Sequence, residues 1–183
     1  GWKLARDVRA ARRFVGREEG FGAYLSTVGI VSLGMIGRRV CELLRSTDLR
    51  VIAYDPYATP AQAAACGATL VGLDELFATA DVVSLHTPWL PETENMIRER
   101  HFRSLKRNAS FINTARGAVV AETEMVRVLA ERPDLQAVLD VTHPEPPPPD
   151  SPLYTLPNVV LTPHIAGSVG GECRRHGRYM VDE

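Results

Sequence analysis

The stretch TVGIVSLGMIGRRV, which begins at Thr27, constrains the fold more than any other part of the sequence. A short apolar run rich in β-branched residues is followed at once by the pattern S-x-G-x-x-G and then by a helical pattern. A strand, a tight glycine turn and a helix in this order form the unit that binds a dinucleotide pyrophosphate at a helix N-terminus. The stretch therefore predicts the first part of a dinucleotide-binding domain.

Two of the three glycines of the G-x-G-x-x-G pattern are present in this turn. Gly34 stands where the backbone approaches a pyrophosphate, and Gly37 stands where the helix packs closely on the strand. Ser32 replaces the first glycine, and we expect it to support the turn if its φ stays negative. Its hydroxyl would then lie near the helix N-terminus, where anions bind.

A carboxylate at the end of the next apolar run supports the same site. Asp55, in AYDPY, follows the glycine turn at the required distance of about 20 residues. An acid at this position accepts hydrogen bonds from the ribose hydroxyls of NAD and would repel the 2′-phosphate of NADP. The competing interpretation is a surface aspartate that starts an Asp-Pro turn. The predicted cofactor is NAD.

Short apolar segments alternate with helical patterns along the rest of the chain. The apolar segments are hydrophobic throughout, which is typical of parallel strands covered on both faces. We therefore predict an α/β fold, a doubly wound parallel sheet of the Rossmann type. Strands are predicted at residues 28–31, 50–55, 68–71, 81–86, 108–115, 136–141 and 158–164, and helices at 37–46, 59–67, 73–80 and 122–132.

Composition argues against several other classes of protein. The chain is 45% hydrophobic and 23% charged, which is ordinary for a globular protein. Its net charge of -1 gives no electrostatic reason to expect nucleic acid or an anionic membrane as partner. No apolar run approaches the roughly 20 residues that span a bilayer. The three cysteines show no C-x-x-C spacing and look like free thiols, so we expect a cytoplasmic protein.

Polar residues follow three of the later predicted strands. Arg116 follows one strand in FINTARGAVV, Asp140 and Glu145 follow another in LDVTHPEPPPPDSPLY, and His164 follows a third in NVVLTPHIAGS. We expect them along one rim, because the carboxyl ends of parallel strands share an edge of the sheet. A guanidinium there can bind a carboxylate, a histidine can exchange a proton near neutral pH, and a carboxylate can orient that histidine.

Each of these residues also has a structural interpretation. Arg116 could form a surface ion pair, Glu145 could be a solvated loop acid, and His164 could cap a helix. His143, Glu145 and His164 are all residue types that bind metal ions. However, the H-x-E spacing lies in a proline-rich loop without a thiolate or a second close ligand, so no metal is expected.

The remaining histidines are expected to play no part in catalysis. We predict that His86 lies at a strand end near the cofactor. His101 and His176 lie on predicted helices, and we expect both of them at the surface.

Four segments, VGIVSLGMIG, INTARGAVV, LDVTHPEP and VVLTPHIAG, resemble the motifs of the D-isomer-specific 2-hydroxyacid dehydrogenases, in the same order and at similar spacing. The resemblance covers about residues 27–168 and implies hydride transfer between NAD and a small D-2-hydroxy acid or 2-keto acid. It implies that His164 is the acid/base, with Glu145 as its carboxylate partner. Arg116 would anchor the carboxylate and carbonyl of the substrate.

The resemblance also implies a set of residues in contact with the cofactor. Met35 and Ile36 would lie over the pyrophosphate, Asp55 would bind the adenosine ribose, and Asp140 would meet the carboxamide. The complete set is Gly34, Met35, Ile36, Gly37, Asp55, Pro88, Thr93, Thr114, Ala115, Arg116, Asp140, His164 and Gly167.

The domain organisation follows from the resemblance too, because the family inserts its cofactor domain within a second lobe. We expect residues 1–26 to form an N-terminal interdomain helix and linker, residues 27–168 the NAD-binding domain, and residues 169–183 a C-terminal interdomain helix. The substrate lobe would be largely absent from this chain, and the protein would be a homodimer. A non-enzymatic NAD-sensing module, similar to the corepressors that share this fold, is the alternative, and turnover of 2-keto acids would separate the two.

Overall fold

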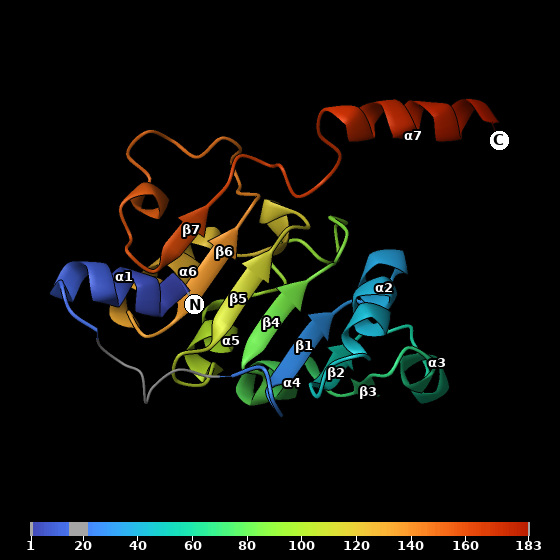
Figure 1. Cartoon of the computed structure of the whole chain (residues 1–183), viewed down its shortest axis with the longest axis horizontal. Coiled ribbons are helices and arrows are strands. Elements are labelled where there is room, and N and C mark those ends of the chain that lie inside the picture. The colour runs from blue at the N-terminus through green and yellow to red at the C-terminus, as the bar shows by residue number, and fades with distance from the viewer. Residues whose placement is uncertain (1, 15–21, 183) are drawn as a thin grey trace.

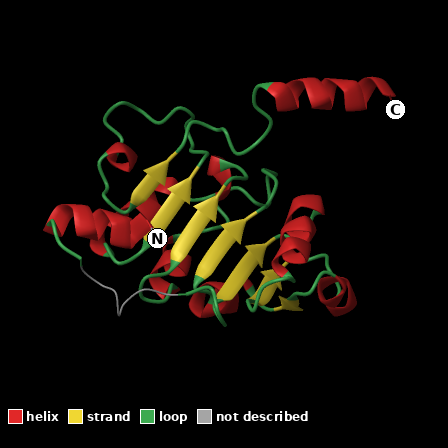
Figure 2. Ribbon diagram, viewed as in Figure 1, coloured by secondary structure: helices red, strands yellow, loops and turns green. Residues whose placement is uncertain are grey.

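The computed structural model describes residues 2–14 and 22–182 (Figure 2). The strands are β1 (Thr27–Val31), β2 (Arg50–Tyr54), β3 (Thr69–Leu70), β4 (Val82–Leu85), β5 (Ser110–Asn113), β6 (Gln136–Leu139) and β7 (Val159–Leu161). The helices are α1 (Trp2–Ala11), α2 (Met35–Leu44), α3 (Pro60–Ala65), α4 (Leu73–Thr79), α5 (Glu99–Ser104), α6 (Glu122–Glu131) and α7 (Gly171–Asp182). Two short 3₁₀ helices, η1 (Gly117–Val119) and η2 (Pro152–Tyr154), were not predicted.

All seven strands lie in one parallel sheet, in the order β3-β2-β1-β4-β5-β6-β7 (Figure 1). The direction in which strands are added reverses between β1 and β4, and open α/β sheets bind ligands in the crevice at such a point. The predicted doubly wound parallel sheet is therefore confirmed. The predicted strands are all present; β1 begins one residue earlier than predicted, and the other strands are shorter because polar residues at their ends turn into loops.

Two hydrophobic clusters account for the continuous apolar strands. The larger cluster lies between the sheet and helices α4, α5 and α6, and it includes Phe77, Phe102 and Phe111. The smaller cluster lies beneath α2 and α3. Along β1, Ile30 belongs to the smaller cluster and Val31 to the larger one. Successive side chains of a strand point to opposite faces, so a strand between two cores must be apolar at every position.

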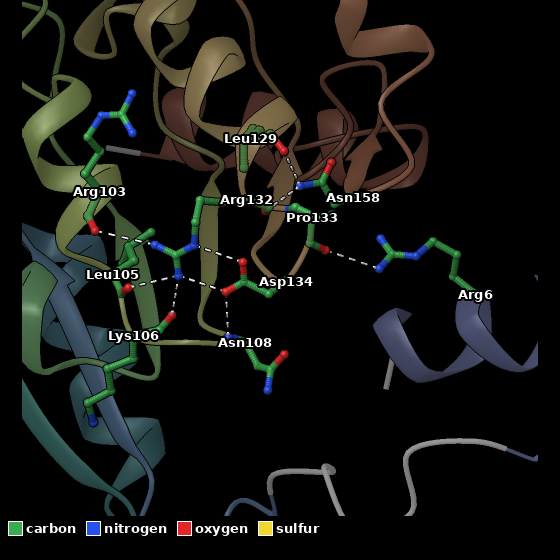
Figure 3. A network of polar contacts seen from close by, with 10 residues as sticks. All are labelled: Arg6, Arg103, Leu105, Lys106, Asn108, Leu129, Arg132, Pro133, Asp134 and Asn158. Atoms are coloured by element: carbon green, nitrogen blue, oxygen red, sulfur yellow. Dashed lines mark hydrogen bonds and ion pairs between the residues drawn. The ribbon is translucent and has the colours of Figure 1, made fainter.

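A polar network lies at the amino ends of the strands, on the side of the sheet opposite the glycine turn (Figure 3). Arg132, which follows α6, donates to both carboxylate oxygens of Asp134 at 2.9 and 2.8 Å. The same guanidinium donates to the backbone carbonyls of Arg103, Leu105 and Lys106 at the end of α5. Arg6 of α1 donates to the carbonyl of Pro157 at 2.8 Å. These bonds join α5 to the segment after α6, and α1 to the segment before β7, at the amino ends of the strands.

Helix α7 is exposed along its described length. Every described side chain from residue 163 to residue 181 is exposed. Figure 1 shows α7 beyond the carboxyl ends of the strands and clear of the sheet. Among the described residues, none of the helices combines the length and the apolar character needed to cross a membrane.

His101 is buried, so the prediction that it lies at the surface was wrong. Its ring packs 5.0 Å from that of Phe77, and its Nδ1 accepts the backbone N–H of Arg98 at 2.9 Å. Its Nε2 lies 3.1 Å from Oδ1 of Asp74 but outside hydrogen-bond geometry. Burial, followed by the charge of Arg100, lowers the pKa of His101. The error arose because α5 packs against both α4 and α6, and the sequence of a short helix does not show which face is enclosed. His176 is exposed, as predicted.

Candidate active site

The glycine turn between β1 and α2 forms, but Ser32 adopts a φ of +79° rather than the expected negative value. The packing of the turn explains the difference. A Cβ on Gly37 would lie 2.0 Å from the carbonyl oxygen of Ser32, so the chain reverses tightly against the helix. The left-handed conformation costs an L-residue roughly 1–2 kcal/mol, which is why glycine is favoured at this position.

The N-terminus of α2 is open. Gly34 is its N-cap residue, and a Cβ added there would have no atom within 4 Å. The next two side chains, Met35 and Ile36, are 88% and 64% exposed. The first backbone N–H groups of a helix lack partners within the helix and carry partial positive charge. This end of α2 can therefore receive a phosphate group.

Asp55 closes this turn from the end of β2. Its Oδ2 accepts the N–H of Leu33 at 2.8 Å, and its Oδ1 accepts the N–H groups of Tyr57 and Ala58 at 2.8 and 3.1 Å. Asp55 therefore starts a local turn, as in the structural interpretation, and its carboxylate also reaches the glycine turn. A carboxylate has about four acceptor positions. The fourth is used by a 3.4 Å contact with the Ser32 hydroxyl, which a ribose hydroxyl could replace.

The side chains of Glu145 and His164 are in hydrogen-bond contact at the carboxyl edge of the sheet. Oε1 of Glu145 lies 2.6 Å from Nδ1 of His164, and the two side chains are 42% and 46% exposed. His164 has a φ of +54°, in the left-handed region. Its N–H donates to the backbone carbonyl of Asp140 at 3.0 Å, which fixes the loop after β7 against the end of β6.

The buried carboxylate of Asp140 holds the same loop. It accepts the N–H groups of Ile165 and Ala166 at 2.9 and 2.8 Å and the hydroxyl of Thr162 at 2.5 Å. Burial by itself would raise the pKa of Asp140, but these three hydrogen bonds together with the nearby His164 lower it. The carboxylate of Asp140 therefore fixes the backbone of the loop that carries His164. The role of Thr162 was missed by sequence reasoning, although a hydroxyl at the end of the last strand was a visible signal.

Arg116 is not part of the Glu145–His164 pair. Its side chain is exposed, and its Nη1 donates to the carbonyl of Ala115 at 2.5 Å. Asn113 closes the loop by donating to the Arg116 carbonyl at 3.0 Å and accepting the Ala115 N–H at 2.9 Å. Sequence reasoning missed this role of Asn113, which the preference of asparagine for such turns could have indicated.

The other predicted cofactor positions lie in loops at the same edge. Thr93 shapes the loop after β4, since its hydroxyl donates to the Pro88 carbonyl at 2.7 Å and accepts the Leu90 N–H at 2.8 Å. Thr114 and Gly167 are exposed, and Ala115 is half-buried.

His86 lies at the crevice between β1 and β4. Its N–H donates to the carbonyl of Val31 at 2.9 Å, and its Nε2 lies 3.0 Å from the hydroxyl of Ser84. Burial lowers the pKa of His86. The residue therefore sits at the strand end where it was expected.

The side chain of His143 packs against Trp89 and not against Glu145. Its ring meets that of Trp89 edge-on, with centroids 5.4 Å apart, and its N–H donates to Glu122 at 2.9 Å. Burial raises the pKa of Glu122, and this hydrogen bond partly opposes the shift. Within residues 2–14 and 22–182, no three His, Cys, Asp or Glu side chains are grouped so that they could hold a metal ion.

A hollow of about 470 Å³ opens beside the Glu145–His164 pair. We call it the β7 hollow, and its lining residues are Asp140, Thr142, Glu145, Pro146, Pro147, Tyr154, Leu161, Thr162, Pro163 and His164. Its volume lies within the range of about 300–1,000 Å³ that is usual for small-molecule sites.

Comparison with known families decides how this edge of the sheet is interpreted. The model of the D-isomer-specific 2-hydroxyacid dehydrogenase NAD-binding domain matches residues 3–166. The chain belongs to this family. The resemblance inferred from the four motifs is confirmed, and NAD is confirmed as the cofactor class. The open Gly34, the closely packed Gly37 and the position of Asp55 all fit the cofactor that the family binds.

Individual relatives agree with this assignment. A D-3-phosphoglycerate dehydrogenase of Archaeoglobus fulgidus is 38% identical over 142 residues, which cover 78% of this chain and 27% of the relative. A glyoxylate reductase of Korarchaeum cryptofilum is 40% identical over 164 residues, covering 90% of this chain and 49% of the relative. The chain thus spans about a quarter to a half of the curated relatives it matches.

Solved structures of the family share the fold. D-lactate dehydrogenase of Lactobacillus jensenii, solved with NAD+, superposes with a TM-score of 0.83 at 27% identity, covering 98% of this chain and 59% of that one. The 2-hydroxyacid dehydrogenase fold therefore extends over nearly the whole chain.

Proposed function

We propose that this chain is the NAD-binding part of an oxidoreductase that acts on a small D-2-hydroxy acid or the corresponding 2-keto acid. The observation that carries the proposal is the 2.6 Å contact between Glu145 and His164, at the carboxyl edge of the sheet of an NAD-binding domain. A carboxylate on Nδ1 fixes the tautomer of the imidazole and stabilises its protonated form, which leaves Nε2 to exchange a proton with a substrate.

NAD(H) supplies or accepts the hydride in such a reaction. In the direction of reduction, Nε2 of His164 would donate a proton to the carbonyl oxygen of the 2-keto acid. In the direction of oxidation, it would accept the hydroxyl proton. Glu145 stabilises the imidazolium in both directions, and Asp140 holds the backbone of the histidine loop in place.

Arg116 is proposed to bind the substrate carboxylate. Its exposed guanidinium has one contact among the described residues, with the adjacent carbonyl of Ala115, so donors remain for a bidentate bond to a carboxylate. The closed loop formed by Asn113 supports this role, because it fixes the backbone from which the side chain extends.

The cofactor contacts are proposed at the positions expected from the motifs. Gly34, Met35 and Ile36 at the open end of α2 would face the pyrophosphate, and Asp55 would bind the adenosine ribose. The loops that carry Pro88, Thr93, Thr114, Ala115, Asp140 and Gly167 would line the nicotinamide half.

We also propose the expected domain organisation, with residues 27–168 as the NAD-binding domain and with residues 1–26 and 169–183 as segments that connect it to a substrate lobe. The exposure of Tyr179, Met180 and Val181 on α7 supports a further packing partner for this helix.

A homodimer is proposed from an incompletely covered face of the sheet. Ile112, Val138 and Val160 lie in one row across β5, β6 and β7 and are only half-buried, opposite the face covered by α4, α5 and α6. Parallel sheets are normally covered on both faces, and a second copy could supply the missing layer. The proposed compartment is the cytoplasm, because the three cysteines, Cys41, Cys66 and Cys173, are free thiols.

Turnover in the full-length protein tests the proposed function. We expect NADH oxidation when glyoxylate, pyruvate or a longer 2-keto acid is supplied, and we expect His164→Ala to abolish it without loss of NADH binding. Tight NADH binding without turnover of any 2-keto acid would instead favour the NAD-sensing alternative. The 183-residue chain should bind NADH but reduce 2-keto acids far more slowly than the ordinary enzymatic rate of about 10 per second.

A further inference from the structure

The loop that carries Glu145 has very few backbone hydrogen-bond donors. Pro144 and residues 146–149 are all prolines, which have no N–H group and a φ fixed at about −65°. Between His143 and Asp150, only Glu145 itself has a backbone N–H. The N–H of His143 is therefore the nearest donor to Glu145 on the side of the loop that comes from β6.

Glu122 accepts the N–H of His143. Its Oε2 lies 2.9 Å from the backbone nitrogen of His143, and the Glu122 side chain is half-buried. Glu122 is the first residue of α6, and the buried side chains of Met125, Val128 and Leu129 pack this helix into the larger hydrophobic cluster. The acceptor for the His143 N–H is thus held by an element that is itself fixed to the core.

Two further contacts enclose the same stretch of backbone. A Cβ on Gly117 would lie 2.1 Å from the carbonyl carbon and oxygen of Thr142, so the loop after β5 packs directly on Thr142. The ring of Trp89, from the loop after β4, meets the ring of His143 edge-on. Residues 142 and 143 are therefore held between α6 and the loops after β4 and β5.

The position of His143 is transmitted to Glu145 through Pro144. The proline ring fixes one backbone angle between the two residues, and the Thr142 hydroxyl donates to the Pro144 carbonyl at 2.8 Å. A displacement of His143 would therefore move Glu145 as well. Oε1 of Glu145 lies 2.6 Å from Nδ1 of His164, and a hydrogen bond of this kind weakens steeply when its distance or angle changes.

We propose that Glu122 is a positioning residue of the active site, which holds Glu145 against His164 through the backbone N–H of His143. The proposal rests on the proposed function, in which His164 exchanges a proton with the substrate. Glu122 lies outside the four motifs, so the resemblance gave it no role.

Two substitutions separate the reach of the Glu122 side chain from its charge. Glu122→Gln keeps the length and an acceptor oxygen but loses the charge, whereas Glu122→Asp keeps the charge and is shorter by one methylene group. The full-length protein is assayed with NADH and either glyoxylate or pyruvate. We expect Glu122→Asp to lower kcat by about tenfold or more, because a shift of about 1 Å in a catalytic group can cost about a hundredfold.

The same assay should show a different result for Glu122→Gln, which should keep kcat within about threefold of the wild-type value. In both variants the KM for the keto acid and the affinity for NADH should be unchanged, because neither Arg116 nor the glycine turn is altered. Loss of folded protein would instead reduce the amount of NADH bound per chain.

Glu124 offers a matched control on the same helix. It also lies in the first turn of α6, and its Oε2 accepts the backbone N–H of Glu99 in α5 at 2.7 Å. Glu124→Asp makes the same change to an equivalent contact outside the Glu145 loop and should leave kcat unchanged.

A double-mutant cycle shows whether Glu122 acts through Glu145. In the Glu145→Ala background no carboxylate remains to be positioned, so Glu122→Asp should cost less than about twofold in kcat. A structural effect independent of Glu145 would cost the same in both backgrounds.

Amide hydrogen exchange tests the contact without turnover. Histidine is labelled selectively with 15N in the full-length protein, and exchange of the His143 N–H is followed by NMR. It should be at least about tenfold faster in Glu122→Asp than in the wild type. Glu122→Gln and Glu124→Asp should exchange at the wild-type rate.

The outcomes separate this inference from the proposed function. Wild-type kcat in Glu122→Asp, an equal loss in Glu122→Gln, a loss that persists in the Glu145→Ala background, or unchanged His143 exchange would each overturn the positioning role. Turnover by the wild-type protein would uphold the proposed function in all four cases. If the wild-type protein reduces no 2-keto acid, the proposed function fails and the positioning role fails with it.

Discussion

Nδ1 of His164 lies 2.6 Å from Oε1 of Glu145, and the two residues come from loops that follow adjacent strands. The carboxylate partner of the proposed acid/base thus comes from a proline-rich loop without regular secondary structure. Because Glu145 contacts Nδ1 directly, replacing it with an isosteric amide tests the effect of its charge on the histidine.

Glu145→Gln should reduce the turnover of 2-keto acids by about a hundredfold in the full-length enzyme. The amide can still accept a hydrogen bond from Nδ1, but it lacks the charge that stabilises the imidazolium. NADH affinity, measured by fluorescence titration, should be unchanged. Glu75→Gln on the exposed surface of α4 is the matched control. Unchanged kcat in Glu145→Gln would remove Glu145 from the mechanism.

Asp55→Asn should narrow the preference for NADH over NADPH. The wild-type carboxylate would repel the 2′-phosphate and accept a ribose hydroxyl, and the amide loses the charge while it keeps one acceptor oxygen. We expect the ratio of the two dissociation constants, measured by calorimetry, to fall by about tenfold or more. Comparable affinities of the wild-type chain for both cofactors would contradict the role of Asp55.

Ser32→Gly should stabilise the fold. The positive φ of Ser32 costs roughly 1–2 kcal/mol, which glycine avoids, although glycine loses about 0.5–1 kcal/mol through the greater freedom of its unfolded chain. The net gain in the free energy of unfolding should be up to about 1 kcal/mol. Urea denaturation measures it, and a loss of stability would show that the hydroxyl of Ser32 matters more than its backbone.

Alanine substitutions at Gly34 and Gly37 should affect different properties, NADH affinity at Gly34 and stability at Gly37. Gly37→Ala places a methyl group 2.0 Å from the Ser32 carbonyl, so the turn must shift and stability should fall by several kcal/mol. Gly34→Ala meets no atom within 4 Å and should keep its stability, yet bind NADH at least about tenfold more weakly because the methyl group enters the pyrophosphate site. Equal NADH affinity of Gly34→Ala and wild type would contradict the proposed position of the cofactor.

Acid should destabilise the protein partly through His101. Burial lowers the pKa of His101 in the folded state, so between that value and the unfolded value of about 6.5 the unfolded state binds more protons. The free energy of unfolding should therefore fall as the pH drops below about 6.5. The pKa of His86 is lowered as well and adds to the same slope.

His101→Gln should flatten this pH dependence. His101 is the third residue of α5 and accepts the N–H of the N-cap residue Arg98, a contact that glutamine makes at the same position of a capping box. Urea denaturation between about pH 5 and pH 7 should show a smaller slope in the variant, with the remainder due to His86. An unchanged slope would mean that His101 is already protonated or exposed.

The candidate site could be predicted from the sequence where local pattern and strand order were sufficient. Arg116, Glu145 and His164 each follow a strand, so the parallel sheet brings their loops to one edge. The contact of Glu145 with His164 was expected from the resemblance and is present. Apolar periodicity alone could not show this contact, or that Arg116 lies apart from the pair, because both depend on the paths of loops without periodicity. Asp140 shows the same limit. The sequence did not show that its carboxylate holds the histidine loop through the backbone N–H groups of Ile165 and Ala166.

The sequence by itself determined the order of strands and helices, the parallel sheet and the position of the glycine turn, because apolar periodicity and turn chemistry are local properties of the chain. Only the tertiary structure decided the φ of Ser32 and the burial of His101. The first depends on the close approach of the Ser32 carbonyl to Gly37, and the second on the packing of α5 between α4 and α6. Both are contacts between elements, and the free energy of such contacts outweighs the local preference of a single residue.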